Sequence, residues 1–191
     1  GCAGGRECQN WLQLSMEFAA DNRGKMMLTV KAILEKGIGK YTDLTLNVSG
    51  EINCHHNYAA LENHRGKEVW VHRKGAVEAK NGQRAVIPGA MGSYSYVVMG
   101  LGNEESFCSS SHGAGRRYSR KGAMEAFRCE EVILELERQG VVLGKKGKAD
   151  VAEESGFAYK EIDAVVDNQQ GLVITLQRLR LIGMETRENL D

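Results

Sequence analysis

Apolar residues recur at three- and four-residue steps through the first part of the chain, from residue 9 to about residue 36. Gly24 and Lys25 interrupt the pattern once, and its apolar positions are Leu12, Met16, Ala19, Met26, Val30 and Ile33. Side chains with this spacing lie on one face of an α-helix. The pattern therefore predicts one long helix or two helices in tandem.

The middle of the chain changes to a two-residue period, which is typical of β-strands. The change follows Gly37 and Gly39 and appears first in Tyr41, Leu44, Leu46 and Val48. Residues 69–72, 85–87 and 94–98 are also strand-like. We therefore expect this region to be mostly sheet.

The last third of the chain mixes helical and ambiguous segments. Residues 121–139 carry an apolar helical face, and Gly140 is placed to end that helix. A basic loop at residues 145–148 and a short helix within residues 160–169 are expected to follow. Residues 172–182 alternate in a way that fits a helix or a strand, and that choice stays open. The mixture predicts an α+β protein with mixed or antiparallel sheets and flanking helices.

Composition narrows the class of protein. The chain has 25 basic and 25 acidic residues, so no net charge recruits nucleic acid or an anionic membrane, and any RNA contact must be local. Its apolar runs fall short of the roughly 18 to 20 residues that cross a bilayer. We therefore expect a soluble, cytoplasmic protein without a membrane partner.

The five cysteines lack a CxxC pair and argue against a disulfide framework or a structural zinc site. The single proline, Pro88, gives no proline-rich linker between domains.

Two histidine-containing segments carry candidate chemistry: NCHHNY at residues 53–58 and SSSHGAGR at residues 109–116. Neutral imidazole is a good ligand for manganese or zinc. Adjacent histidines on an extended segment point to opposite faces, so only one of His55 and His56 would face a given site. An isolated pair of histidines is more often a surface or core feature than a metal site, and both interpretations stay open.

His112 lies in a short segment that suits phosphate binding. Gly113 and Gly115 let a phosphate approach the main chain closely, and Arg116, Arg117 and Arg120 supply guanidinium groups nearby. A histidine in such surroundings can act as a nucleophile on the α-phosphate of a nucleotide. The same residues can also form a plain turn.

Two further segments are glycine-punctuated or basic. Residues 87–95, IPGAMGSYS, lie between two strand-like stretches and read alone as a β-turn. The cluster around Arg73, from His72 to Gly75, is solvated surface or a contact to an RNA phosphate.

Taken together, six segments resemble the RtcB family of RNA ligases in order and spacing. They are NCHHNY (53–58), RKGAV (73–77), IPGAMGSYSYVV (87–98), GLGNEESFCSSSHGAGR (100–116), SR (119–120) and AYKEIDAVV (158–166). The resemblance runs from about Phe18 to Ile182. It implies an RtcB-like α+β fold, with residues 1–191 as the C-terminal portion of a single catalytic domain.

The resemblance also implies an activity. Members of this family use GTP and manganese to join an RNA 3′-phosphate or 2′,3′-cyclic phosphate end to a 5′-hydroxyl end, in tRNA splicing and RNA repair. They do so through a covalent histidine–GMP intermediate. The expected partners are therefore GTP and RNA, as tRNA halves or broken RNA ends.

Carried over by motif, the resemblance makes His112 the guanylylated residue and His56 a metal ligand, with His55 as its support. It places Tyr159 against guanine. The implied nucleotide-binding residues are His56, Asn57, Pro88, Gly89, Ala90, Met91, Ser95, His112, Gly113, Ala114, Gly115 and Tyr159. The arginines expected to hold RNA phosphates are Arg73, Arg116 and Arg120.

Some positions depart from the family pattern. The family's remaining metal ligands, an aspartate and a cysteine in a DxxCG-type motif and two histidines, lie in its N-terminal half and match nothing here. Thr186 stands near an expected lysine, and Ala90 stands where serine is common. We therefore expect this chain to be inactive alone and to need an N-terminal half. It is then either the C-terminal fragment of a longer enzyme or one chain of a split enzyme, with that half as a separate chain. The alternatives are a non-catalytic module that binds RNA ends or a partner protein, and a metal-dependent phosphatase or nuclease.

Overall fold

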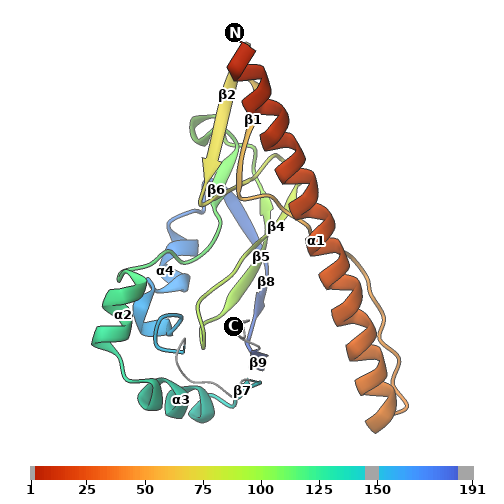
Figure 1. The fold of residues 1–191 in the computed structure, drawn as a ribbon, viewed down its shortest axis with the longest axis vertical. Helices are drawn as coiled ribbons and strands as arrows, with labels where there is room; N and C mark the ends of the chain where they lie inside the picture. Colours follow the sequence, from red (N-terminus) through yellow and green to blue (C-terminus); the bar gives the residue numbers. More distant parts are fainter. Residues whose placement is uncertain (1–2, 145–150, 185–191) are drawn as a thin grey trace. The chain divides into compact units, whose positions relative to one another are not determined.

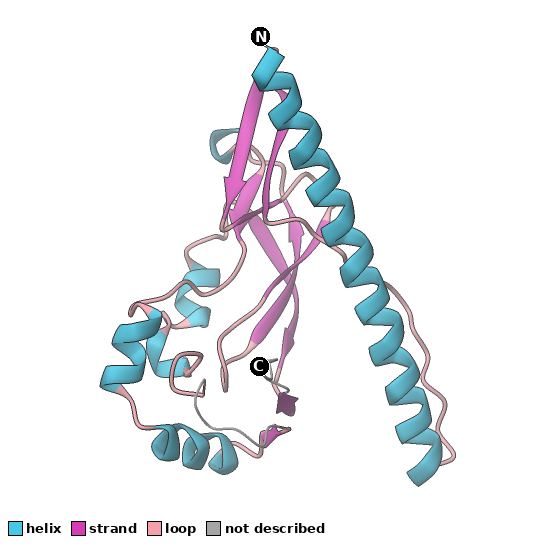
Figure 2. Cartoon of the chain, viewed as in Figure 1, coloured by secondary structure: helices cyan, strands magenta, loops and turns pink. Residues whose placement is uncertain are grey.

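The computed structural model describes residues 3–144 and 151–184. The chain divides into two compact units, Gly1–Lys74 and Gly75–Asp191. It combines helices with mainly antiparallel strands, which confirms the α+β class (Figures 1 and 2). The expected basic loop at residues 145–148 and Thr186 lie outside the described residues. Among the described residues, no helix combines the length and the apolar character that crossing a bilayer requires.

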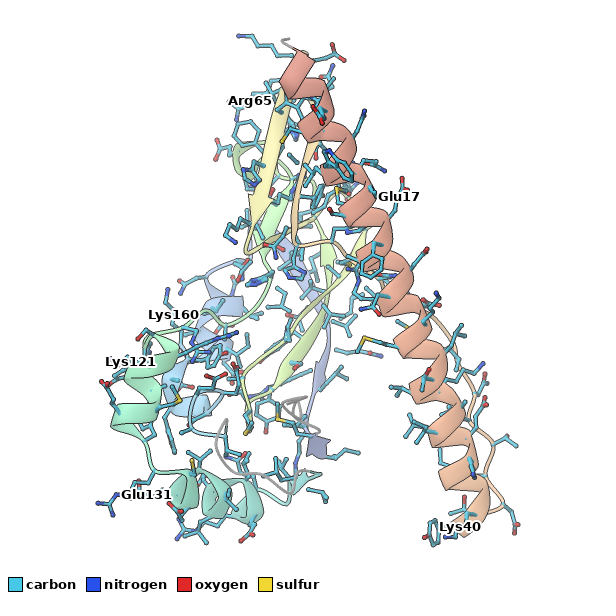
Figure 3. All side chains as sticks on the ribbon, in the orientation of Figure 1. Glu17, Lys40, Arg65, Lys121, Glu131 and Lys160 are labelled. Atoms are coloured by element: carbon cyan, nitrogen blue, oxygen red, sulfur yellow. The ribbon has the colours of Figure 1, made fainter. Side chains whose placement is uncertain are left out.

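The first unit begins with one long helix, which is one of the two possibilities that the apolar spacing left open. Helix α1 (Ala3–Tyr41) continues through Gly24 without a break. Glu17 and Lys40 mark its course in Figure 3, where side chains project from all around it. Many of the helix's large apolar side chains are exposed: Trp11, Leu14, Phe18, Met26, Leu28, Val30 and Ile33. The helix therefore presents more apolar surface than the first unit itself covers.

Gly24 lowers the stability of α1, because glycine loses more backbone freedom in a helix than alanine does. A β-carbon at Gly24 would have no atom within 4 Å. The Gly24→Ala variant should therefore raise the free energy of unfolding by up to about 1 kcal/mol. Urea unfolding followed by circular dichroism would measure this. Gly37→Ala, near the C-terminal end of the helix and equally free of contacts, is the control and should have a smaller effect; a lower midpoint for Gly24→Ala would contradict the prediction.

A β-hairpin completes the first unit. Strands β1 (Asn57–His64) and β2 (Lys67–Lys74) pair antiparallel over their whole length. Arg65 and Gly66 form the connection with φ angles of 51° and 76°. Two-residue hairpin turns favour this left-handed conformation because it matches the twist of the strands.

The expectation of a strand around Leu44, Leu46 and Val48 is wrong. Residues 42–56 connect α1 to β1, and in the part of the chain that the structure describes they pair with no strand. A two-residue period becomes a strand only where a neighbouring strand offers its backbone groups. Leu44 is instead 72% exposed.

The second unit is built on a three-stranded antiparallel sheet in the order β4 (Arg84–Ile87), β5 (Ser95–Gly100), β8 (Val173–Leu179). Alternate residues of β4 and β5 are buried, with Ile87 and Val98 at 0% exposure. β3 (Ala76–Glu78) pairs antiparallel with β6 (Ser109–Ser111), and β7 (Val142–Leu143) pairs parallel with β9 (Gly183–Met184). The strand-like stretches at residues 69–72 and 85–87 are thus confirmed as parts of β2 and β4, and the stretch at 94–98 is confirmed as part of β5 from Ser95 onwards.

The short helices of the second unit are η1 (Glu104–Ser106), α2 (Arg120–Ala126), α3 (Cys129–Arg138), η2 (Gly156–Ala158) and α4 (Ile162–Asp167). A core forms between α3 and the loop after β4, where Met91, Val132, Leu136, Val141 and Val151 are buried together. Helix α4 confirms the short helix expected within residues 160–169.

The helix predicted over residues 121–139 is two helices. Phe127 leaves the helical conformation, with φ −121° and ψ 136°. Its ring packs edge-on against Tyr118 and tilted against Phe157, with centroids 5.3 and 5.7 Å away. These aromatic contacts accompany the break. Gly140 ends α3 with φ 72°, as predicted.

The open choice at residues 172–182 is decided for a strand. β8 pairs antiparallel with β5, with a register irregularity between Val97 and Val98. The edge of β5 supplies the hydrogen-bonding partners that a sequence pattern alone cannot identify.

Candidate active site

His112 follows directly after β6, and its backbone is fixed by β3. The register pairs Ala76 with Ser111 and Val77 with Ser110. One step further, the His112 amide donates to the Gly75 carbonyl at 3.4 Å. A β-carbon built on Gly75 would lie 3.7 Å from His112 Cε1, so the imidazole lies on the side of Gly75 where another residue would carry its side chain. The half-buried ring is therefore held at the end of a strand, beside a glycine.

The residues after His112 contact the loop that follows β4. The Ala114 amide donates to the Pro88 carbonyl at 3.3 Å. A β-carbon on Gly113 would meet the same carbonyl oxygen at 3.2 Å, which is tighter than ordinary contact. The HGAGR segment and the IPGAMGSYS segment, separate in the sequence, are thus adjacent in the fold.

The loop after β4 turns too tightly to admit a side chain at Gly89. A β-carbon there would lie 2.0 Å from the Tyr94 carbonyl oxygen. The Gly89 amide donates to Ser95 Oγ at 3.2 Å, and the Ser93 amide donates to the Ala90 carbonyl at 2.9 Å. Glycine at position 89 is therefore required by the path of the loop.

Tyr159 joins this group through the backbone. The Lys160 amide donates to the Gly115 carbonyl at 2.9 Å, and Arg116 and Tyr159 form an isolated β-bridge. Met91 forms a second isolated bridge with Ser155. The second unit therefore brings together the predicted residues Pro88, Gly89, Ala90, Met91, Ser95, His112, Gly113, Ala114, Gly115, Arg116 and Tyr159.

A cavity of about 510 Å³ lies next to these segments, and both Met91 and Tyr159 line it. The rest of its lining includes the aromatic residues Tyr118, Phe127 and Phe157 and the acidic residues Glu135, Glu161 and Asp163. Pockets with aromatic walls and a few polar groups are typical of small-ligand sites.

The guanidinium of Arg116 is bonded within the protein through all three of its nitrogens. Nη1 donates to the Tyr159 hydroxyl at 2.7 Å and to Glu154 Oε1 at 3.3 Å. Nε donates to the Tyr118 carbonyl at 3.1 Å, and Nη2 donates to the Glu153 carbonyl. We therefore revise the expectation that Arg116 holds an RNA phosphate.

The Tyr159 hydroxyl in turn donates to Glu154 Oε2 at 2.5 Å. Burial first, and then the hydrogen bond and negative charge of Glu154, raise the pKa of Tyr159 from 10.0 to about 12, against the opposing effect of Arg116. The hydroxyl is therefore protonated at neutral pH. Sequence reasoning missed Glu154, because it lies 38 positions from Arg116 and no local motif contains both.

The histidine pair belongs to the first unit, just before β1. Arg23 of α1 donates to Asn53 Oδ1 at 2.7 Å and to His55 Nδ1 at 3.4 Å. The His55 ring also meets Tyr58 edge-on, with centroids 5.8 Å apart. Burial, followed by the charges of Arg23 and His56, lowers the pKa of His55 below 6.5. His55 thus makes the packing contacts, while His56 and Asn57 are exposed.

Arg73 is not a surface residue, and its predicted contact with an RNA phosphate is revised. Its exposure is 2%, and its two terminal nitrogens donate to the two carboxylate oxygens of Glu62. Nη1 also donates to the Tyr58 hydroxyl at 3.1 Å. The two-residue period of β2 places Arg73 on the same face as Val69 and Val71, and that pattern could have revealed its burial.

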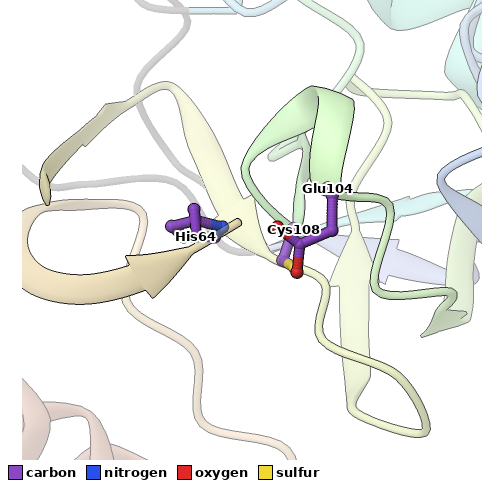
Figure 4. Close-up of side chains that lie close together, drawn as sticks. All are labelled: His64, Glu104 and Cys108. Atoms are coloured by element: carbon purple, nitrogen blue, oxygen red, sulfur yellow. The ribbon is translucent and has the colours of Figure 1, made fainter. Parts of the chain in front are cut away.

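Other polar residues are placed as follows. Arg120, expected to hold an RNA phosphate, is exposed at the start of α2, behind the N-cap Ser119. In the turn at η1, a carboxylate oxygen of Glu104 lies within 4.8 Å of Cys108 Sγ (Figure 4). His64, labelled in the same figure, ends β1, and its Nε2 lies 2.9 Å from Glu62 Oε2.

These features define an α+β protein in which a half-buried histidine lies among glycine-containing loops and an anchored tyrosine. The family model described as "tRNA-splicing ligase RtcB" matches residues 4–185. The chain therefore belongs to the RtcB family. The match begins well before Phe18, where the resemblance was expected to start.

Similar proteins span bacteria and archaea. The "RNA-splicing ligase RtcB" of Escherichia coli (strain K12) is 45% identical over 176 residues, which cover 90% of this chain and 41% of that protein. The "tRNA-splicing ligase RtcB" of Methanocaldococcus jannaschii is 35% identical over 163 residues, covering 74% and 17%. That of Pyrobaculum aerophilum is 32% identical over 190 residues, covering 87% and 39%. The chain thus spans about two fifths of the length of its Escherichia coli relative.

Proposed function

We propose that this chain carries the guanylate-accepting part of a GTP- and manganese-dependent RNA ligase. The enzyme would join RNA 3′-phosphate or 2′,3′-cyclic phosphate ends to 5′-hydroxyl ends, in tRNA splicing or RNA repair. The observation that supports this most is the meeting of His112, the Pro88–Gly89 loop and the Tyr159 segment in one compact unit. The names of the relatives support RNA as the substrate.

In the first chemical step, a ring nitrogen of His112 attacks the α-phosphorus of GTP. A nitrogen–phosphorus bond forms, the bond from the α-phosphorus to the bridging oxygen breaks, and pyrophosphate leaves with the electron pair. The hydrogen bond from the His112 amide to the Gly75 carbonyl would fix the backbone from which the nucleophile approaches.

In this proposal the glycine-containing loops bind the phosphates of GTP, and Tyr159 binds its base. Gly115, three residues after His112, is exposed and leaves its main chain accessible to phosphate oxygens, while the buried Gly113 lets the segment pack against the Pro88 carbonyl. Ser95, by holding the Gly89 amide, fixes the neighbouring loop. Tyr159 presents an aromatic ring that suits stacking on guanine.

The chain offers part of a metal site. His56 carries an exposed imidazole, a donor that suits manganese, and His55 beside it takes the packing contacts. Manganese would offset the charge of the triphosphate and orient the α-phosphorus. A single imidazole does not complete such a site. We propose that the other ligands come from the remaining part of an RtcB sequence, in the same chain or a separate one.

The apolar surface of α1 supports this need for the remaining part of the sequence. Trp11, Leu14 and Phe18 follow helical spacing and are 62%, 55% and 72% exposed. Contiguous exposed apolar residues of this size mark a protein–protein contact. The rest of an RtcB domain is the occupant that we propose for them.

The test is complementation. The chain is mixed with the portion of the Escherichia coli relative that it does not match, together with GTP, manganese and an RNA carrying a 3′-phosphate and a 5′-hydroxyl. We expect joined RNA and a GMP adduct on this chain. Neither product with the mixture, while the full-length relative joins the same RNA, would contradict the proposal.

Ala90 and Thr186, which stand where the family usually has serine and lysine, favour one alternative. It is a non-catalytic RtcB-like module that binds RNA ends or a partner protein. This alternative predicts RNA binding that weakens with salt but no adduct under any complementation. Joining activity would remove it.

A further inference from the structure

Tyr159 is held on its hydroxyl and on one face of its ring by two residues with no assigned role. Arg116 Nη1 donates to the hydroxyl at 2.7 Å, and the hydroxyl donates to Glu154 at 2.5 Å. The guanidinium carbon of Arg116 also lies over the ring, 4.7 Å from its centroid. Arg116 and Glu154 are joined by their own ion pair at 3.3 Å.

We propose that Arg116 and Glu154 are positioning residues that fix the Tyr159 ring for stacking on the base of the nucleotide. The proposal rests on the proposed function, in which Tyr159 meets guanine. It adds two residues to the site and gives Arg116 a task other than binding RNA phosphate.

The hydrogen-bond pattern explains why the ring, and not the hydroxyl, would meet the base. The hydroxyl donates its one proton to Glu154 and accepts from Arg116, so its main hydrogen-bonding capacity is used inside the protein. The guanidinium lies over one face of the ring, and a base would stack on the opposite face. A tyrosine fixed in this way loses little conformational freedom when the base arrives, which favours binding.

Arginine suits this task better than lysine. Its planar fork donates at the same time to a hydroxyl, a carboxylate and backbone carbonyls, and its plane packs on an aromatic ring. The Nε and Nη2 bonds to the carbonyls of Tyr118 and Glu153 anchor the guanidinium independently of Tyr159. A lysine at position 116 would keep the charge but lose the fork and the planar contact.

The positioning is tested first without any enzymatic activity. In the full chain labelled with carbon-13 at the tyrosine ζ position, the Tyr159 signal is assigned by Tyr159→Phe and titrated by NMR. Because Glu154 raises the pKa of Tyr159, Glu154→Gln should lower that pKa from about 12 towards 10.0. Glu153→Gln is the matched control: Glu153 contributes only its backbone carbonyl, so that variant should leave the Tyr159 titration unchanged.

The link to the nucleotide is tested in the complemented enzyme. Glu154→Gln and Arg116→Lys should each raise the KM for GTP about tenfold, because a misplaced ring loses part of the free energy of stacking on the base. The kcat for adduct formation should change less than about twofold. Glu153→Gln should leave both constants unchanged. If Glu154→Gln does not fold, Arg116→Lys carries the test.

Two results would overturn the inference. One is a Tyr159 titration that Glu154→Gln moves no further than Glu153→Gln does. The other is an Arg116→Lys variant with an unchanged KM for GTP and weakened RNA binding. That result would indicate that Arg116 binds an RNA phosphate, as the sequence first suggested. A failure of the proposed function is distinguishable, because the mixture would then form no adduct while the NMR result stood.

Discussion

Replacing His112 with alanine should abolish the covalent attachment of GMP to this chain. In the proposed reaction the ring of His112, at the end of β6, is the attacking group, so the variant would lose the proposed nucleophile itself. We expect adduct formation to fall on the order of a thousandfold or more. The measurement uses GTP labelled at the α-phosphate, manganese and the complementing part of a relative, followed by peptide mapping. The nitrogen–phosphorus bond predicts a label that acid removes and alkali spares.

His72→Ala is the matched control, since His72 is an exposed histidine of β2. It should keep the label. Gel filtration and circular dichroism of both variants would show that the loss is chemical and not a failure to fold. Label that persists in His112→Ala, or that maps to a peptide without residue 112, would refute the assignment of the nucleophile.

Replacing Gly89 with alanine should damage the fold and the site together. The new β-carbon would lie 2.0 Å from the Tyr94 carbonyl oxygen and 2.9 Å from Ser93 Cβ. A backbone carbonyl cannot move aside like the end of a flexible side chain, so the loop must shift, which disturbs its hydrogen bonds to Ser95 and Ala114. We expect a loss of about 1 to 3 kcal/mol in the free energy of unfolding.

The measurement is the urea midpoint of the full chain, with adduct formation recorded below the unfolding transition. We expect adduct formation to fall at least tenfold, because a small displacement of a positioning loop is costly to catalysis. Gly24→Ala, where the β-carbon meets nothing within 4 Å, is the control for adding a methyl group. A Gly89→Ala variant with an unchanged midpoint and normal labelling would show that this loop is not required.

Elements whose cause is local were predictable. The apolar spacing of α1, the alternation of β4 and β5 and the helix-ending Gly140 depend on neighbours within a few residues, and the structure has all of them. The strand expected around Leu44 failed, and the helix at residues 121–139 divided at Phe127. Among the described residues, no strand lies beside Leu44 to pair with it. Phe127 packs on Tyr118 and Phe157, and the helical pattern of residues 121–139 contains neither of these two residues.

The arginines show the same limit within the candidate site. Arg73, Arg116 and Arg120 look alike in the sequence, as basic residues near glycines or histidines. Only Arg120 is exposed, whereas Arg73 is paired with Glu62 and Arg116 with Glu154 and Tyr159. A guanidinium takes the partner that the fold brings within reach, and charge alone does not identify it.

By itself, the sequence determined the α+β class, the helical character of the first segment and membership in the RtcB family, because periodicity and motif order can be read from the sequence of residues alone. The tertiary structure alone decided that the loops at Pro88, His112 and Tyr159 meet, and that Glu154 and Arg116 hold Tyr159. The physical reason is distance along the chain. Arg116 and Tyr159, for example, are 43 positions apart, and such contacts exist only after the strands and helices have packed.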